Sequence, residues 1–463
     1  MKILIERFGP INKFEFDLDK NLIVTYGDNN IGKSYAMQIV YLLLKTFILN
    51  RYMNPRSYRQ MLIYPRHITI NTSKIENLVR EFINSSEQTK DITNDTINQV
   101  NDMICSSFMP EFINSCKNTF GNIERTLENS PIIVLSYDEF DLTIELKKSK
   151  IHVDNMKAKP IFLKKTNSDF HKSRNLTNHF DIYVVDNIER PAEIIFHKMR
   201  EMFIYYINQI PGDYENVYFL PASRSGIYAG MNAFGSIVAE LSRNRAYFTK
   251  KIEFPGISEP ISDYFISLSN IKQKANESLE QFYSCIENKI LKGKVTFDKS
   301  KNALLYNPNN LNASFEMTEV SSMVSEVSPI VAFLKYIVSV GMFKGKKAKA
   351  ILFIEEPEAH LHPNNQIALI EIFAKLIREN VKLIISSHSN YVFNKLNNLV
   401  LNKDLDYKEY DPIILLEERP TEGSVSKHLK INELGADDEN FVDVSEYLYN
   451  ERLDIIEKMN MEE

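Results

Sequence analysis

A phosphate-binding loop is predicted near the start of the chain. The segment GDNNIGKS, Gly27 to Ser34, fits the spacing G-x-x-x-x-G-K-[ST], and it stands between a predicted strand and a predicted helix. Its two glycines let successive backbone N–H groups face an anion, and the helix N-terminus adds a positive field. We expect Lys33 to reach the β- and γ-phosphates of a nucleotide and the Ser34 hydroxyl to bind Mg²⁺. The predicted contacts are Gly27, Asp28, Asn29, Asn30, Ile31, Gly32, Lys33, Ser34 and Tyr35.

A second segment places two carboxylates at the end of an apolar run. In ILFIEEPEAHLHP, Ile351 to Pro363, four apolar residues lead directly into Glu355 and Glu356. A buried strand that ends in acids beside a phosphate loop suits two tasks, which are holding Mg²⁺ and activating the attacking water. We assign Glu355 to the metal and Glu356 to the water. The alternative is a strand that ends at a solvated acidic loop.

A third segment, LIISSHSN, Leu383 to Asn390, is an apolar run that ends in Ser-Ser-His. His388 could donate a hydrogen bond to a γ-phosphate, since it lies one strand and one helix after the acids. A structural histidine is the alternative.

These segments require a sheet that brings strand ends together. Phe14 and Phe16 alternate with charged neighbours, which predicts half-buried strands near the N-terminus. Later apolar runs alternate with helical patterns, which indicates a buried, mainly parallel sheet. The sequence therefore predicts an α/β fold with N-terminal antiparallel strands. The later runs are Val217–Leu220, Ile351–Ile354, Leu383–Ile385 and Ile413–Leu416, with a helix at about Asn365–Glu379.

Three parts of the chain are predicted. Residues 1–50 hold the phosphate loop, and residues 213–463 hold the acids, the histidine and a C-terminal helix. Residues 51–212 are rich in Asn, Ser and Lys and form a mostly helical insertion with a two-stranded stretch at Ile132–Val153. The insertion lacks sustained heptads, which argues against a long coiled-coil arm.

Composition narrows the class of protein. The 463 residues are 44% hydrophobic and 25% charged, as in ordinary globular proteins, and the net charge of −6 does not indicate a general nucleic-acid binder. Nucleic acid stays open as a partner, because the lysines between Lys147 and Lys165 could grip phosphates or form a solvated face.

The location of the protein is expected to be cytoplasmic. Three scattered cysteines indicate reduced thiols. No apolar run reaches the roughly 20 residues of a membrane span, and the N-terminus has no signal-peptide pattern.

In this order, GDNNIGKS, IEEPEAHLHP and SSHS resemble the ABC/SMC-like ATPases. The closer resemblance is to the AAA-family set of bacterial defence ATPases that includes the OLD-type, Septu and PARIS-type proteins. It covers residues 1–49 and about 217–463. It implies an ABC-type P-loop NTPase fold, ATP and Mg²⁺ as ligands, and ATP hydrolysis with Lys33, Glu356 and His388 as catalytic residues.

The resemblance also implies a head-to-tail homodimer, or a higher oligomer, in which each nucleotide lies between one subunit's phosphate loop and its partner's signature segment. The matching segment here is Glu319 to Leu334, in which Ser321 and Ser322 would approach the γ-phosphate. Met323 stands where the family usually has glycine, which leaves the site geometry and the hydrolysis rate open. The alternative for this segment is a helix capped by a serine.

YFLPASRSG, Tyr218 to Gly226, resembles a segment that these ATPases place near the nucleotide. Arg224 could stabilise phosphate charge or pair with an acid, and we include it among the nucleotide-binding residues. Gln60 is the nearest candidate for the glutamine of the family's glutamine loop.

OLD-type relatives carry a Toprim nuclease domain, for which the roughly 75 residues after His388 leave no room. Asp404 and Asp406 are expected in a loop before Ile413 instead. The last segment reads as a helix with a capping box at Asp443 and Glu446. Its apolar stripe is expected to join the core or to form a docking face, and consists of Val444, Leu448, Ile455 and Met459.

Three functions are compatible with these patterns. The first is an ATPase sensor or regulator of a bacterial antiphage defence or toxin system, with a separate nuclease-like effector. The second is a DNA-repair or recombination ATPase of the RecF or SMC type, which should have a continuous basic surface. The third is a scaffold that binds ATP without hydrolysing it, for which Met323 is the best support.

Overall fold

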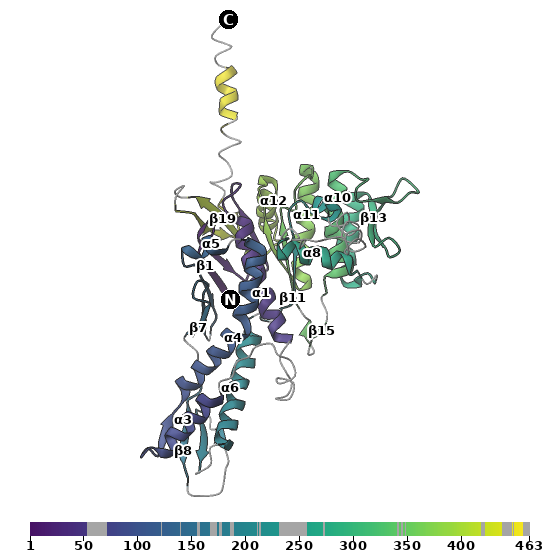
Figure 1. The fold of residues 1–463 in the computed structure, drawn as a ribbon. Coiled ribbons are helices and arrows are strands. Elements are labelled where there is room, and N and C mark those ends of the chain that lie inside the picture. Colours follow the sequence, from purple (N-terminus) through teal and green to yellow (C-terminus); the bar gives the residue numbers. More distant parts are fainter. Residues whose placement is uncertain are drawn as a thin grey trace, which may run out of the picture.

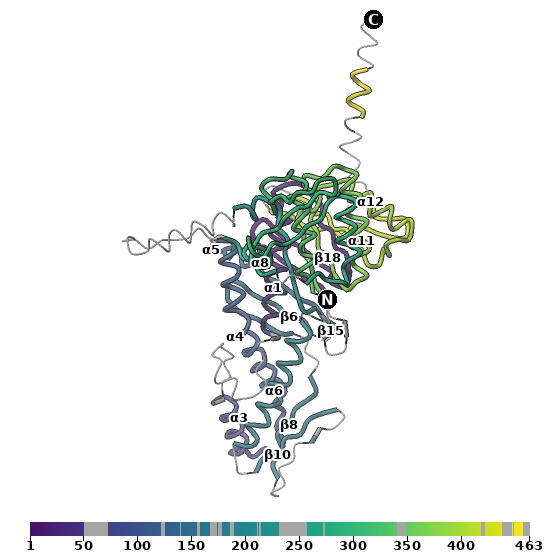
Figure 2. Tube along the Cα trace, turned by 90° about the vertical axis from the view of Figure 1, so that its right-hand side faces the viewer, coloured from purple at the N-terminus to yellow at the C-terminus, as the bar shows by residue number. Residues whose placement is uncertain are grey.

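A broad body built on one large sheet carries a narrow arm of helices and strands (Figures 1 and 2). The computed structural model describes residues 1–52, 72–121, 123–138, 140–154, 158–166, 174–175, 178–185, 189–210, 212, 214–230, 257–271, 274–339, 342–343, 346–347, 349–417, 422–437, 447 and 449–456.

The large sheet has eleven strands in the order β11-β17-β18-β3-β19-β20-β2-β1-β5-β6-β7 within the described residues. From β11 to β19 every neighbouring pair is parallel, whereas β1 and β2 form an antiparallel hairpin. The fold class predicted from the sequence is therefore confirmed. The strands of the parallel part are β3 (Leu22–Tyr26), β11 (Tyr214–Leu220), β17 (Lys349–Glu355), β18 (Val381–Ser386) and β19 (Tyr410–Glu417).

The N-terminal side of the sheet is longer than the sequence suggested. The segment Ile132–Val153, predicted as two strands, forms three antiparallel strands, the first of which pairs with β1, so that the three extend the large sheet. These strands lie inside the predicted insertion, so the division of the chain at residues 50 and 212 stays a proposal. The strands are β1 (Lys2–Phe8), β2 (Ile11–Asp17), β5 (Ile132–Ser136), β6 (Asp141–Glu145), β7 (Lys150–Asp154) and β20 (Ser424–His428).

The parallel strands are apolar on both faces, so alternate residues enter two separate cores. Ile351 and Phe353 of β17 pack in one hydrophobic cluster with α1, whereas Leu352 and Ile354 pack in the other. The helices of the second cluster include α10, α11 and α12. The helices of the body are α1 (Lys33–Tyr52), α8 (Glu259–Ser269), α9 (Glu280–Ile286), α10 (Ser322–Ala332), α11 (Pro363–Leu376) and α12 (Asn390–Leu401).

The arm is mainly helical and carries its own small sheet, in the order β4-β8-β10-β9. Helices α4 and α6 both contact α1, so the arm is continuous with the layer that covers the phosphate-loop helix. The elements that follow α1 up to β11 are α3 (Thr72–Asn84), β4 (Thr89–Asp91), α4 (Thr93–Phe120), α5 (Ile123–Glu128), β8 (Ile161–Lys165), β9 (Arg174–Asn175), β10 (Phe180–Val184) and α6 (Glu189–Gln209), besides β5–β7.

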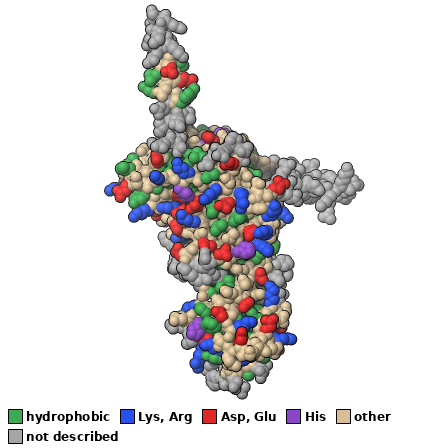
Figure 3. Space-filling model, turned by 90° about the vertical axis from the view of Figure 1, so that its left-hand side faces the viewer, with side chains coloured by type: hydrophobic (Ala, Val, Ile, Leu, Met, Phe, Trp, Pro, Cys, Tyr) green, Lys and Arg blue, Asp and Glu red, His purple; other side chains and the backbone are tan. Residues whose placement is uncertain are grey.

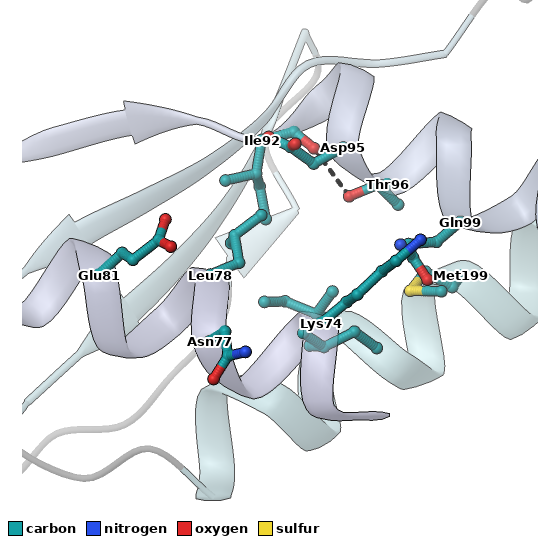
Figure 4. Close-up of a pocket in the computed structure, with 11 residues that line it drawn as sticks. Lys74, Asn77, Leu78, Glu81, Ile92, Asp95, Thr96, Gln99 and Met199 are labelled. Carbon is teal, nitrogen blue, oxygen red and sulfur yellow. Dashed lines mark hydrogen bonds between the residues drawn. The ribbon is translucent and has the colours of Figure 1, made fainter. Parts of the chain in front are cut away.

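A cavity of ≈ 340 Å³ lies in the arm. Side chains of α3, α4 and α6 line it, with apolar residues such as Leu78 and Met199 beside polar ones such as Lys74 and Gln99 (Figure 4).

Shorter elements complete the body. A three-stranded antiparallel sheet stands in front of α10 and packs its apolar side chains into the second cluster. Its strands are β12 (Gly293–Asp298), β13 (Ala303–Pro308) and β14 (Phe315–Glu316). The remaining short elements are η2 (Glu277–Leu279), η3 (Glu287–Leu291), η4 (Phe333–Ile337), β15 (Met342–Phe343), β16 (Lys346–Lys347), η5 (Ile377–Glu379), β21 (Ile431–Asn432) and β22 (Gly435–Ala436).

Helical residues near the C-terminus stand away from the body (Figure 1). Ile455 of the predicted apolar stripe is 53% exposed, so it does not join the core, and that alternative is wrong for this residue. Asp443, Val444, Glu446, Leu448 and Met459 lie outside the described residues. Across the described part of the chain, the search for a helix of membrane-spanning length and apolarity finds none.

Candidate functional site

Three neighbouring parallel strands, β17, β18 and β3, bring the predicted segments to one edge of the sheet. In the strand register, Glu355 lies opposite Ser386, and Ser386 lies opposite Thr25. The acids, the Ser-Ser-His turn and the phosphate loop therefore all begin where these strands end. In open parallel sheets, ligands bind at the carboxyl ends of the strands, so this edge is the candidate site.

The phosphate loop has the backbone that its glycines allow. Gly27 has a φ of 136°, and a Cβ atom there would lie 2.5 Å from the carbonyl oxygen of Leu415, so only glycine fits without rearrangement. Gly32 has a φ of 102°. The buried Lys33 ammonium donates to the carbonyl oxygens of Gly27 at 2.9 Å and Asp28 at 2.6 Å. The Lys33 side chain thus folds back over its own phosphate loop.

Burial lowers the pKa of Lys33 to about 8, although the nearby carboxylates of Glu356, Asp28 and Glu358 oppose this shift. A nucleotide phosphate would bring negative charge to the ammonium and raise its pKa again. The charge of this lysine in the free protein is therefore sensitive to mildly alkaline pH.

Glu355 is a buried carboxylate with one oxygen available. Its Oε2 atom accepts a hydrogen bond of 3.1 Å from the Ala222 amide. Its Oε1 atom is buried and has no hydrogen-bond partner among the described residues. Burial raises the pKa of Glu355, and the Ala222 amide and the Ser34 hydroxyl partly offset this effect. A carboxylate oxygen and a serine hydroxyl oxygen are ligands of the kind that Mg²⁺ takes, so Glu355 and Ser34 fit the predicted metal.

Glu356 and His388 face each other across the strand ends, with 3.6 Å between Oε1 and Nε2. The histidine, more than desolvation, determines the pKa of Glu356, which is lowered. Glu356 has a φ of 43°, an uncommon backbone conformation for a residue with a side chain. Its amide donates to the Ser386 carbonyl at 3.0 Å, which ties this turn to the neighbouring strand. The structure thus brings the ionised acid and the histidine together.

Glu358 is a functional candidate that the sequence analysis missed. Its Oε1 atom accepts from the Ser387 hydroxyl at 2.7 Å and from the His388 amide at 2.8 Å. It therefore fixes the turn that carries His388. The sequence shows a third acid two residues after Glu356, but it does not indicate which of the acids faces the histidine turn.

Ser321 and Ser322 are exposed at the N-terminus of α10. Ser321 occupies the N-cap position, yet its side chain makes no capping hydrogen bond. Met323 packs against the second hydrophobic cluster. Figure 1 shows α10 apart from α1, the helix that follows the phosphate loop.

Arg224 is fully buried and lies behind the acids. Its guanidinium donates to the Glu355 carbonyl at 2.7 Å and the Glu356 carbonyl at 3.2 Å, and it pairs with Glu326 at 3.5 Å. Burial lowers the pKa of Arg224, and Glu326 opposes this shift. Two roles were predicted for this arginine, and the structure shows the pairing with an acid. Contact with a phosphate would require the guanidinium to leave these partners.

Several other predicted residues lie apart from this edge or outside the described residues. Gln60 and Lys157 belong to the latter group. Asp404 and Asp406 accept from Asn402 and the Lys408 amide in the loop before β19. The described residues contain no group of three or more His, Cys, Asp or Glu side chains that could hold a metal.

Comparison with known families decides the assignment. Residues 1–393 match the family described as AAA ATPase domain. The chain belongs to this family. The phosphate loop, both acids and His388 all lie within the matched residues.

No curated protein matches this AAA ATPase domain protein. Two solved structures are distantly similar to it. One is an SMC head bound to the C-winged helix domain of ScpA, with 10% identity, a TM-score of 0.37, and coverage of 93% of this chain and 98% of that one. The other is the SMC head domain from Thermotoga maritima, with 9% identity, a TM-score of 0.32 and the same coverages of 93% and 98%. The fold assignment therefore rests on the strand order of the large sheet and not on these two similarities.

The lowered pKa of Lys33 predicts that nucleotide affinity falls in mildly alkaline solution. As the pH rises above about 8, the free protein progressively loses the Lys33 proton, and binding must restore it. We expect the Kd for ADP to rise by up to about tenfold per pH unit above this value, because one proton is taken up on binding. Calorimetric titration between pH 7 and 9.5 measures this.

Lys33→Ala is the matched control, and its weaker ADP binding should not change over the same pH range. Titration at pH 8.5 in two buffers of different ionisation enthalpy counts the protons directly. A wild-type Kd that stays constant up to pH 9.5 would contradict the pKa assigned to Lys33.

Proposed function

We propose that this protein hydrolyses ATP with Mg²⁺ as a dimer, and that it acts as a sensor or regulator of a separate effector. The observation that carries the proposal is the convergence of Lys33, the Glu355–Glu356 pair and His388 at the ends of three adjacent parallel strands. Phosphoryl transfer depends on positioning and charge stabilisation, which these groups can supply together.

Each side chain has a defined task in this proposal. Lys33 leaves the loop carbonyls and contacts the β- and γ-phosphates. Ser34 and Glu355 hold Mg²⁺, which neutralises charge on the phosphates when bound. Glu356 stays ionised, orients the attacking water and accepts its proton. His388, held by Glu358, donates a hydrogen bond to the γ-phosphate.

The dimer is proposed from the position of α10. Its N-terminus is exposed, and the Ser321 side chain makes no local capping bond. Helix N-termini attract phosphate, and α10 lies apart from α1, the helix that follows its own chain's phosphate loop (Figure 1). A head-to-tail homodimer would let Ser321 and Ser322 reach the partner's nucleotide.

The regulatory role is proposed from what the site does and does not contain. All the chemistry-bearing groups described above serve one nucleotide, and the described residues hold no second cluster that could bind a metal. The resemblance to bacterial antiphage defence ATPases favours an ATPase that controls a separate nuclease-like protein. Cytoplasmic location belongs to the same proposal.

A DNA-repair role of the RecF or SMC type has less support. Several lysines of the predicted basic run have local partners, since Lys148 pairs with Glu145 at 2.6 Å and Lys164 pairs with Asp181 at 2.9 Å. The face in Figure 3 shows basic and acidic side chains interspersed. A scaffold that only binds ATP would need no base, whereas Glu356 is ionised and faces His388.

Glu356→Gln and Lys33→Ala should separate turnover from binding. The first removes the base and is expected to lower kcat by about 10²–10⁴-fold with ATP binding retained. The second removes a phosphate contact and should weaken ATP binding. Phosphate release and ATP titration measure these effects, with the exposed Glu76→Gln on α3 as a neutral control. Wild-type turnover by Glu356→Gln would refute its assignment as the base.

Mixing two inactive variants tests the composite site. Lys33→Ala disables the phosphate loop, and Ser322→Arg blocks the segment offered to the partner. One dimer in two of a random equal mixture pairs the different subunits, and each such dimer keeps one intact site. We expect the mixture to regain up to about a quarter of wild-type ATPase activity, and less if the two sites are coupled. A mixture as inactive as its components, at concentrations where dimers form, would argue against the sandwich.

The proposed regulator should cleave no nucleic acid by itself. We expect the purified protein to hydrolyse ATP while plasmid DNA and total RNA stay intact with Mg²⁺ or Mn²⁺. Gel electrophoresis measures this, with a Lys33→Ala preparation to reveal contaminating nucleases. Cleavage that Asp404→Ala abolishes and Lys33→Ala retains would reveal a second active site.

A further inference from the structure

One buried ion pair joins the signature helix to the acids. Arg224 and Glu326 are both almost completely buried, at 0% and 1% exposure. Arg224 begins the helical segment that follows β11, whereas Glu326 lies on α10, one turn after the exposed Ser322. Two elements that are distant in sequence thus share a charge pair directly beneath the predicted site.

Four of the five N–H groups of the guanidinium donate to backbone carbonyl oxygens. Nη1 donates to Glu355 O at 2.7 Å and to Pro221 O at 3.1 Å, Nη2 donates to Glu356 O at 3.2 Å, and Nε donates to Glu326 O at 3.0 Å. The planar fork of arginine can make these contacts at once, which a lysine ammonium cannot do. Any shift of Arg224 therefore moves the peptide between the two acids.

The Glu326 carboxylate holds the start of the helical segment that follows β11. Its Oε2 accepts from the Arg224 amide at 3.0 Å, and its Oε1 accepts from the Ser225 amide at 3.2 Å and the Ser225 hydroxyl at 2.6 Å. The neighbouring Ala222 amide donates to the Glu355 side chain. The turn from residue 221 to residue 225 is thus bonded to α10 on one side and to both acids on the other.

A contribution to folding stability does not by itself explain why the Arg224–Glu326 pair is buried. Burying two charges costs desolvation energy that their attraction only repays with good geometry, and apolar replacements of such pairs are often as stable. What an apolar pair could not do is fix the Glu355–Glu356 peptide relative to α10.

We propose that Arg224 and Glu326 are positioning residues that couple the signature helix to the Glu355–Glu356 peptide of the same chain. The inference rests on the proposed ATPase dimer. In that dimer, α10 contacts the partner's nucleotide, whereas Glu356 acts on the nucleotide of its own chain. A displacement of α10 at one nucleotide is transmitted through the pair to the acids at the other. The two sites therefore hydrolyse ATP cooperatively.

The test compares Glu326→Gln and Ser225→Ala with wild type. Both weaken the link without touching the nucleotide, so ADP affinity should stay within about twofold. We expect Glu326→Gln to lower kcat by up to about 10²-fold, the cost of misplacing a catalytic group. The Hill coefficient for ATP should fall from above 1 to about 1. Ser225→Ala, which removes one contact, should change both in the same direction by less.

Glu287→Gln is the matched control. Glu287 is also buried and pairs with Lys335 at 2.9 Å within the second cluster, but this pair bonds to β12 and not to the acids. The Glu287→Gln substitution should lower the thermal unfolding midpoint without changing kcat or cooperativity. The Ser225→Ala variant keeps the test decisive if Glu326→Gln does not fold.

The outcomes separate the two proposals. Unchanged kcat and cooperativity in both link variants overturn the coupling, and so does non-cooperative hydrolysis by the wild-type dimer. In each of these cases the proposed ATPase would stand. A wild-type protein that binds but does not hydrolyse ATP would instead refute the proposed function.

Discussion

Parallel pairing of β3 between β18 and β19 is the constraint on which the site depends. It joins the first strands of the chain to strands more than 350 residues later, with Val24 opposite Ile385 and Pro412. Because parallel strands end at one edge, this pairing places the phosphate loop beside the histidine turn, and the pairing of β17 with β18 adds the acids. The insertion can lie between the two halves since the closure of long loops costs little additional entropy.

Within that frame, the groups assigned to the phosphates and the attacking water were the easiest to propose from the sequence. Gly27, Lys33 and Glu356 each lie next to an apolar run, Gly27 and Lys33 at the fixed spacing of a phosphate loop. Local chemistry dictates this spacing and these residue types. Glu358 and Arg224 were harder, because their roles depend on which backbone groups the tertiary fold brings to them. Glu326 gave no signal at all, since an acid inside an apolar helix becomes interpretable only when its partner is known.

Errors about whole elements have a similar cause. The segment of β5–β7 was predicted as a two-stranded stretch of the insertion, because alternation reports a half-buried face and not the strand that pairs with it. β1 supplies that partner from the other end of the chain. The apolar stripe near the C-terminus also has helical spacing, which predicts an amphipathic helix but not what covers it. Ile455 is exposed here, so core membership was the wrong inference from a correct pattern.

The uncommon backbone of Glu356 connects these observations. A positive φ at a glutamate costs of order 1 kcal/mol or more and persists only where neighbours determine it. Those neighbours are the Ser386 carbonyl, which accepts from its amide, and Arg224, which donates to its carbonyl. The strained peptide is thus held from the β18 side and from the α10 side. An acid held in this way is sensitive to movement of either support, so the catalytic role proposed for Glu356 would depend on both.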